Sequence, residues 1–185
     1  MSITEKFQIP RGVTLIELLV TLSVLSILLT VGVPSFNQFS TSSRLNSYSN
    51  TLFSHMTLAR SEAIKRNSRV VVCKSSDGLS CTNSGGWNQG WVVFVDLDNS
   101  AGISGGEQIL TSMAALPTGY SFSGNTNVSN YISYDGQGIP KLTSGAFQSG
   151  TITLCPTPPA AGGNGRDIII GGSGRLRIAK ITSCA

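Results

Sequence analysis

Two arginines near the carboxyl end of the chain have the spacing of a binding site for a polyanion. Arg175 and Arg177 follow a glycine run that ends at Gly174, and they enter a predicted strand. Alternate residues of a strand share a face, so the two guanidinium groups would project together, about 7 Å apart. That separation matches consecutive phosphates on one nucleic-acid strand, and contacts of this kind tolerate any base sequence and weaken with salt.

Positive charge is concentrated in the same part of the chain. The formal net charge is +4, and from position 141 onward five bases face a single acid, Asp167. Lys180 adds charge beyond the arginines, although a regular strand would place it on the opposite face. The tail, residues 174–185, contains no aromatic residue, so we do not expect bases to stack on it. The alternative interpretation is a final sheet strand whose arginines are simply exposed to water.

An acidic loop between two predicted strands matches a calcium-binding pattern only in part. Asp96, Asp98, Ser100 and Glu107 occupy positions 1, 3, 5 and 12 of an EF-hand loop. The glycine required at position 6 is Ala101 here, and strands rather than helices are predicted on both sides. We therefore interpret the segment as an acidic hairpin turn and predict no metal site.

Groups that could carry out catalysis do not form a recognisable set. A Ser-His-Asp triad would have to include His55, the only histidine, which lies on a predicted helix near the membrane. The glycine run at residues 171–174 lacks the Lys-Ser/Thr ending of a phosphate-binding P-loop. We interpret the protein as a non-enzyme and predict no cofactor.

Four cysteines, an even number, are typical of disulfides in an exported protein. Three pairings are possible. Loop closure favours Cys73–Cys81, a short loop with a hairpin signal, which leaves Cys155–Cys184 to tie the carboxyl end to the domain. Zinc is the rival use of four cysteines, but the sequence has no C-x-x-C spacing and only one histidine.

A long apolar run near the amino terminus, residues 13–33, contains one charge, Glu17. A helix needs about 20 residues to cross a bilayer, and a carboxylate within a span costs roughly 2.5–3.5 kcal/mol, which marks Glu17 as functional. The preceding residues carry Lys6 and Arg11 against Glu5, so we expect the amino end in the cytoplasm. An ordinary secretory signal peptide is the alternative, but its apolar core would be shorter, and no clean cleavage site follows the run.

The predicted elements form one long helix followed by strands. Tyr48, Leu52, Met56, Ala59 and Ala63 recur at helical spacing, so the span and this segment are predicted to form a single helix that ends near residue 67. Strands are then clearly predicted at 69–73 and 90–96, and more weakly near 107–111, 119–123, 131–134, 138–142, 150–154, 167–171 and 175–181. The sequence therefore predicts an α+β fold, in which the outer half of the helix packs on an antiparallel β-sheet domain.

The start of the apolar run resembles the signature of type IV pilins and pseudopilins. That signature is a short basic leader ending in glycine and then x-Thr-Leu-Ile-Glu, and here Gly12 precedes Val13-Thr14-Leu15-Ile16-Glu17. The resemblance implies that prepilin peptidase cleaves after Gly12, and that Val13, where the family usually has Phe, becomes the N-methylated terminus. Glu17 would pair with the free amino terminus of a neighbouring subunit, because buried charges need partners. It further implies a leader at 1–12, a transmembrane and filament-core helix at 13–34, and a periplasmic or extracellular pilin domain at 35–185.

The rest of the chain resembles one branch of the same superfamily. Residues 87–96, the acidic loop and Glu107-Gln108-Ile109-Leu110 are similar to the GspH/FimT/FimU group of minor pilins and pseudopilins. The tail is similar to the Gly-Arg-x-Arg tail by which FimT-type minor pilins bind DNA during natural transformation. The resemblance implies that Gly174, Arg175 and Arg177 form the DNA-binding site and that the two arginines contact the DNA. It also implies that Arg166 and Lys180 act as helpers.

These resemblances imply a minor type IV pilin that binds extracellular double-stranded DNA, without sequence specificity, for uptake. It would be made as a single-pass inner-membrane protein with its carboxyl end in the periplasm. It would then enter a cell-surface pilus together with other minor and major pilins. Two alternatives stay open: a FimU-like structural minor pilin that primes pilus assembly, and a GspH-like minor pseudopilin of type II secretion.

Overall fold

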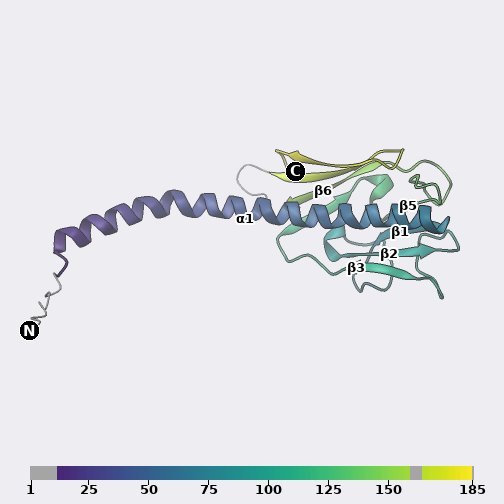
Figure 1. Cartoon of the computed structure of the whole chain (residues 1–185), viewed down its shortest axis with the longest axis horizontal. Coiled ribbons are helices and arrows are strands. Elements are labelled where there is room, and N and C mark those ends of the chain that lie inside the picture. The colour runs from purple at the N-terminus through teal and green to yellow at the C-terminus, as the bar shows by residue number, and fades with distance from the viewer. Residues whose placement is uncertain (1–11, 159–163, 185) are drawn as a thin grey trace, which may run out of the picture. The chain divides into compact units, whose positions relative to one another are not determined.

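The computed structural model describes residues 12–158 and 164–184 (Figure 1). The chain divides into two units, Met1–Ser40 and Thr41–Ala185, and each is described by itself. Of the predicted leader, only Gly12 falls within the described residues.

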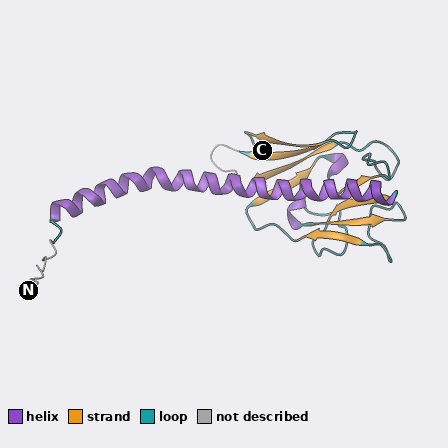
Figure 2. Ribbon diagram, in the orientation of Figure 1, coloured by secondary structure: helices purple, strands orange, loops and turns teal. Residues whose placement is uncertain are grey.

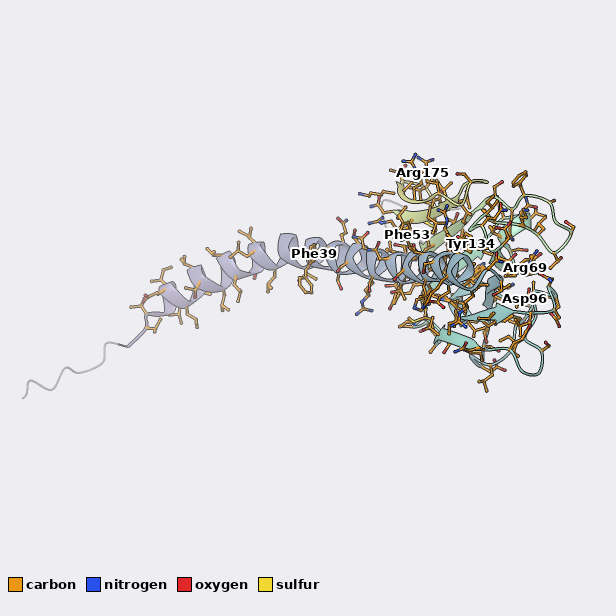
Figure 3. The ribbon with its side chains drawn as sticks, turned by 45° about the vertical axis from the view of Figure 1, so that its right-hand side comes forward. Phe39, Phe53, Arg69, Asp96, Tyr134 and Arg175 are labelled. Atoms are coloured by element: carbon orange, nitrogen blue, oxygen red, sulfur yellow. A yellow bond between two sulfur atoms is a disulfide. The ribbon has the colours of Figure 1, made fainter. Side chains whose placement is uncertain are left out.

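Helix α1, Leu15–Arg66, begins in the first unit and ends in the second. Thr14 caps its first turn, because the Thr14 hydroxyl accepts a hydrogen bond from the Glu17 amide at 3.3 Å. In the first unit, many large apolar side chains of the helix are exposed, including Leu15 and Phe39, of which Figure 3 labels Phe39. Over residues 12–158 and 164–184, no helix combines the length and the apolar character needed to cross a membrane.

In the second unit, α1 buries one face. Its buried apolar side chains recur at helical spacing, and they are Leu45, Leu52, Met56, Ala59 and Ala63. Tyr48, which the sequence predicts on the same face, is only partly buried against them, and Leu45 was not among the predicted residues. The buried side chains form one hydrophobic core with residues of both sheets. The helix ends at Arg66 because Asn67 adopts a left-handed backbone conformation with φ of 49°, which asparagine tolerates better than most residues.

Within the described residues, eight strands form two antiparallel sheets (orange in Figure 2). The first sheet has the order β3-β2-β1-β5, with β1 at Arg69–Lys74, β2 at Trp91–Asp96, β3 at Ile109–Met113 and β5 at Tyr131–Tyr134. The second has the order β4-β6-β7-β8, with β4 at Tyr120–Gly124, β6 at Gly150–Pro156, β7 at Gly165–Ile170 and β8 at Leu176–Ile181. Short 3-10 helices η1, Trp87–Gln89, and η2, Thr126–Val128, lie between strands. Strand β8 is therefore at the edge of its sheet.

The predicted α+β fold, a long helix packed on antiparallel sheet, is confirmed. Large aromatic side chains fill the space between the helix and the sheets, and Trp87 is fixed there by a hydrogen bond from its indole N–H to the Val128 carbonyl at 3.0 Å. The strand predicted at 138–142 is absent as such from the described chain. That segment makes only isolated bridges, between Tyr134 and Pro140 and between Lys141 and Phe147.

The structure contains both disulfides favoured by the cysteine spacing. Cys73 in β1 is bonded to Cys81, with their Cα atoms 5.6 Å apart. Cys155 in β6 is bonded to Cys184, with their Cα atoms 5.8 Å apart. The second bond joins the tail, which follows edge strand β8, to the inner strand β6. It therefore limits how far the tail can move from the domain.

His55 on α1 supports the core. Its Nδ1 accepts a hydrogen bond from the Trp91 indole N–H at 2.9 Å, and this requires Nδ1 to be unprotonated. Burial lowers the pKa of His55 below its usual 6.5.

Acidification should therefore weaken the fold through His55. The unfolded chain binds a proton at His55 more readily than the folded chain does, so stability is full above pH 6.5 and falls as the pH drops below it toward the lowered folded pKa. We expect urea unfolding to give a smaller free energy of unfolding at pH 5 than at pH 7.5. His55→Asn, whose Oδ1 can accept the indole proton but does not titrate, should show a shallower pH dependence. Identical pH dependence in the two proteins would contradict this role.

Candidate functional site

The paired arginines lie at the start of edge strand β8. Arg177 is exposed within β8, and Arg175 is exposed one residue before it. Figure 3 shows the Arg175 side chain at the outer surface of the second unit. The register pairs Arg177 with Ile169, which places it on the face of the sheet opposite the buried Ile168 and Ile170. The structure thus presents both residues to solvent, as the sequence predicts.

Neither guanidinium group is engaged by the residues that the structure describes. Among the described residues, no hydrogen bond or ion pair involves the side chain of Arg175 or Arg177, whereas several other arginines are bonded. The nearby acid Asp167 lies on the same sheet face as Arg177, two residues before Ile169 in β7. Its carboxylate accepts a hydrogen bond from the Thr153 hydroxyl at 2.7 Å. The two arginines are therefore available to an external anion.

The turn between β7 and β8 fixes the direction in which the arginines leave the domain. The Gly171 amide donates to the Arg175 carbonyl at 2.9 Å, and the Gly174 amide donates to the Gly171 carbonyl at 2.8 Å. Gly174 is buried and has φ of +79°. A Cβ atom there would lie 2.7 Å from the Gly138 carbonyl oxygen. Gly174 therefore acts through its backbone, since only glycine fits this left-handed, crowded position.

Arg60 on α1 holds this turn in place. Its Nη1 donates to the Gly174 carbonyl at 2.9 Å and its Nη2 to the Ser173 carbonyl at 3.3 Å. No sequence pattern connects Arg60 with the tail, because Arg60 and its partners Ser173 and Gly174 are more than one hundred residues apart. Arg60 is a positioning residue for the turn that carries Arg175.

Replacing Arg60 by lysine should loosen the turn while keeping the charge. The planar guanidinium reaches two carbonyl groups at once, which a lysine ammonium does not reproduce. Each charge-assisted hydrogen bond contributes about 1.5–3 kcal/mol, so loss of one should speed hydrogen exchange at the Gly171 and Gly174 amides by about 10-fold or more. Arg66→Lys, which alters a helix-end arginine bonded to Glu62, is the matched control. Equal exchange in Arg60→Lys and the wild type would rule out the clamp.

The expectation that Arg166 assists the tail is wrong. Arg166 is 6% exposed and lies on the core-facing side of β7. Its guanidinium donates to the Asn46 side chain at 2.7 Å, to the Ser42 hydroxyl at 3.1 Å and to its own neighbour's carbonyl, that of Gly165, at 2.8 Å. These bonds join β7 to α1, so Arg166 stabilises the fold and is not available to a ligand.

Lys180 is exposed, but it is not grouped with the arginines. The register pairs it with Arg166, on the face opposite Arg177, as its position in the strand predicts. A polar groove of about 540 Å³ lies on the Arg177 face of the sheet, where Asp167 and hydroxyl groups of β4 and β6 line it, and edge-strand residue Lys180 borders it. Lys180 could add charge at the border of the site but not within the arginine pair.

The basic residues at the end of the helix and in β1 are engaged internally, and they are Lys65, Arg66, Arg69 and Lys74. Lys65 and Arg66 both pair with Glu62, at 3.5 Å and 2.6 Å. Lys74 is buried, donates to the Gly85 carbonyl at 2.8 Å, and has its pKa lowered by burial. Arg69 donates to the Asn99 side chain and to the Ser133 hydroxyl. These side chains connect loops of the first sheet. The cluster therefore does not form a second charged surface comparable with the tail.

The acidic loop brings its carboxylates together to organise a hairpin turn. Oxygen atoms of Asp96, Asp98 and Glu107 lie within 4.8 Å of one another. Both Glu107 oxygens accept backbone amides, that of Leu97 at 2.7 Å and that of Ser104 at 2.9 Å. Asp96 is buried, and burial raises its pKa. The carboxylates thus accept backbone amide hydrogens of the turn, and their spacing would also allow them to hold a metal ion.

The predicted processing residues are exposed at the start of the described chain. Gly12 and Val13 are exposed and precede the first residue of α1. Glu17 is exposed in the first turn of the helix, which suits a carboxylate because the amino end of a helix carries partial positive charge. The bond between Gly12 and Val13 is therefore outside the helix.

A methylation-type amino terminus, a long helix and an antiparallel β domain define the class of pilins and pseudopilins. A family model for the type II transport protein GspH matches residues 49–174, more than half of the chain. A second, for the prokaryotic N-terminal methylation motif, matches residues 10–33. The chain belongs to the GspH family and, within the superfamily, to the GspH/FimT/FimU group of minor pilins and pseudopilins.

Solved structures agree on the fold. Two crystal structures of the type IV minor pilin FimU of Pseudomonas aeruginosa strain PAO1, each 18% identical in sequence, are similar to this chain. One has a TM-score of 0.58 and covers 80% of this chain and 99% of FimU; the other has a TM-score of 0.55 and covers 76% and 99%. A search of curated proteins found no match.

Membership in this family has direct consequences. The protein has the role of a minor type IV pilin or pseudopilin, a fold family that is not enzymatic. The methylation motif implies a pilin that is anchored in a membrane and later assembled into a filament, and it suggests prepilin peptidase and other pilins as partners.

Proposed function

We propose that the protein is a minor type IV pilin that binds double-stranded DNA through Arg175 and Arg177. The observation that carries the proposal is a pair of exposed guanidinium groups, alternate in an edge strand, with no partner among the described residues. A charge that is already paired would have to break that pair before it could bind phosphate. Arg175 and Arg177 can bind phosphate without first losing a partner among the described residues.

Binding would be directed at the phosphate backbone. Arginine presents planar donors that suit phosphate oxygens, and contacts with phosphates carry no base information. The Arg60 clamp and the left-handed Gly174 would hold the arginines in one orientation, which lowers the entropy lost on binding. A receptor that accepts DNA of any sequence, as uptake in natural transformation requires, is served by this kind of contact.

Filament assembly would bring the arginines to the cell surface. Prepilin peptidase would cleave after Gly12, Val13 would be methylated, and Glu17 would pair with the amino terminus of a neighbouring subunit. Before assembly, the subunit would be a single-pass inner-membrane protein with its amino end in the cytoplasm and residues 35–185 in the periplasm. This topology rests on the methylation motif and on the basic residues that precede it.

Binding of the full-length chain in nonionic detergent to short labelled duplexes of unrelated sequence tests the proposal. We expect a Kd of roughly 1–100 μM at moderate salt, nearly equal for all sequences, as is typical of phosphate-led binding. No shift of any duplex, or strong preference for one sequence, would contradict it.

A structural role is the second candidate, because the two similar solved structures are those of FimU. In this case the subunit would prime pilus assembly, or serve as a pseudopilin of type II secretion, and its arginines would have no ligand. Deletion of the gene distinguishes the two. Loss of DNA uptake with normal piliation supports the DNA role, and loss of pili or of secretion supports a structural one.

A further inference from the structure

An open apolar depression lies beside the turn that carries the arginines. It has a volume of about 590 Å³ and is lined by Ile139, Phe147, Gly172 and Ser173. Phe147 is 68% exposed, although a phenylalanine gains free energy when it is buried. The exposed ring is therefore available for contact with a ligand.

The walls of this depression are held in place. Phe147 lies in a hairpin closed by hydrogen bonds from the Leu142 amide to the Ala146 carbonyl at 2.8 Å and from the Gln148 amide to the Pro140 carbonyl at 2.9 Å. The opposite wall, Gly172 and Ser173, belongs to the turn that Arg60 clamps. A site on rigid walls loses little conformational entropy when it is filled.

The chemistry of the surroundings indicates what fills it. Arg175 follows Ser173 by two residues, so its Cα lies within about 7 Å of a residue that lines the depression. Phe147 thus lines the same depression as the turn that leads into Arg175. Proteins hold single-stranded nucleic acid by combining an exposed aromatic ring, on which bases stack, with arginines that contact the phosphates. An apolar segment of another subunit would cover the ring but would leave both charges unused.

We propose that Phe147 stacks an unpaired base of a DNA strand whose phosphates contact Arg175 and Arg177. The inference rests on the proposed function and extends it from duplex DNA to single strands and frayed ends. No aromatic residue in the tail could provide such a platform. The fold supplies one from the hairpin that precedes β6.

Fluorescence anisotropy with the full-length chain in nonionic detergent tests this. The probes are one labelled single-stranded oligonucleotide and the blunt duplex of the same sequence. The test variants are Phe147→Ala and Phe147→Tyr. The control is Leu97→Ala, which removes a similarly exposed apolar side chain elsewhere on the domain. We expect Phe147→Ala to weaken single-strand binding about 5- to 100-fold and duplex binding less than about 2-fold, because stacking needs an unpaired base. Phe147→Tyr should retain single-strand binding, and Leu97→Ala should change neither affinity.

A 2-aminopurine base in the single strand reports stacking directly. Its fluorescence should be quenched by the wild type and by Phe147→Tyr but not by Phe147→Ala. If Phe147→Ala binds single strands as the wild type does, or loses single-strand and duplex binding equally, the stacking site is overturned. The stacking site is also overturned if Phe147→Ala binds both probes as the wild type does and its only defect is in assembly with other pilins. The proposed function fails separately, if the wild type binds neither probe.

Discussion

The double variant Arg175→Gln/Arg177→Gln is expected to lose about 100-fold in affinity for duplex DNA. Each arginine makes a charge-assisted contact of about 1.5 kcal/mol or more with a phosphate, and two such contacts amount to about 3 kcal/mol. Glutamine keeps most of the length and a polar end but not the charge. Because both side chains are exposed and make no contact with described residues that an amide would break, the fold should be unaffected.

A control of equal charge makes this result specific. Arg44→Gln/Lys65→Gln removes two exposed positive charges from α1, outside the tail, and should weaken binding only slightly. Circular dichroism and thermal unfolding should be the same for both double variants and the wild type, within the small effect typical of surface substitutions. If the two double variants lose affinity equally, net charge rather than the tail carries binding, and the assigned residues are wrong.

Gly12→Ala is expected to leave the leader on the chain. The bond between Gly12 and Val13 precedes α1, so a protease can bind it as extended chain. The methylation motif has glycine directly before the cleaved bond, so we expect prepilin peptidase to reject a side chain at this position. Coexpression with a prepilin peptidase, followed by intact-protein mass spectrometry, should show the wild type shortened by 12 residues and methylated, and the variant unprocessed.

Gly32→Ala provides the matched control for processing. Gly32 has no heavy atom within 4 Å of where its Cβ would lie, so the substitution should be tolerated and processing should be normal. Efficient cleavage of Gly12→Ala at the same bond would contradict the assigned site. Cleavage of the wild type near residue 33 would instead indicate an ordinary signal peptide.

The sequence predicts the elements better than it predicts how they come together. Strands β1 and β2 are dense in β-branched residues, and the apolar face of α1 repeats at 3.6 residues, so local pattern determines both. The segment at 138–142 is different. Its alternation suggests a strand, but Pro140 cannot donate a ladder hydrogen bond and Gly138 has φ of +73°, so only isolated bridges form.

The candidate site could be predicted in part. Exposure of Arg175 and Arg177 follows from alternation in β8 once Ile168 and Ile170 of β7 define the buried face. The same alternation places Arg166 with those isoleucines, which was the available signal that it is buried. Its partners, Asn46 and Ser42, could not be foreseen because they lie more than one hundred residues away.

Tertiary structure alone joins the remaining parts of the site. Arg60 comes from the helix and Phe147 from a hairpin, and neither stands near the tail in sequence. No periodicity connects such residues, since their proximity depends on how two sheets and a helix pack around one core. The positioning of the arginines and the aromatic wall beside them therefore become visible only in the fold.

The salt dependence of DNA binding tests most directly whether two guanidinium groups of the tail neutralise phosphates. Each neutralised phosphate of a duplex contributes about −0.9 to the slope of log K against log salt concentration. Measured by anisotropy with a labelled duplex, the slope for Arg175→Gln/Arg177→Gln should be smaller in magnitude than that of the wild type by about 1.8. An unchanged slope would show that these arginines do not contact DNA.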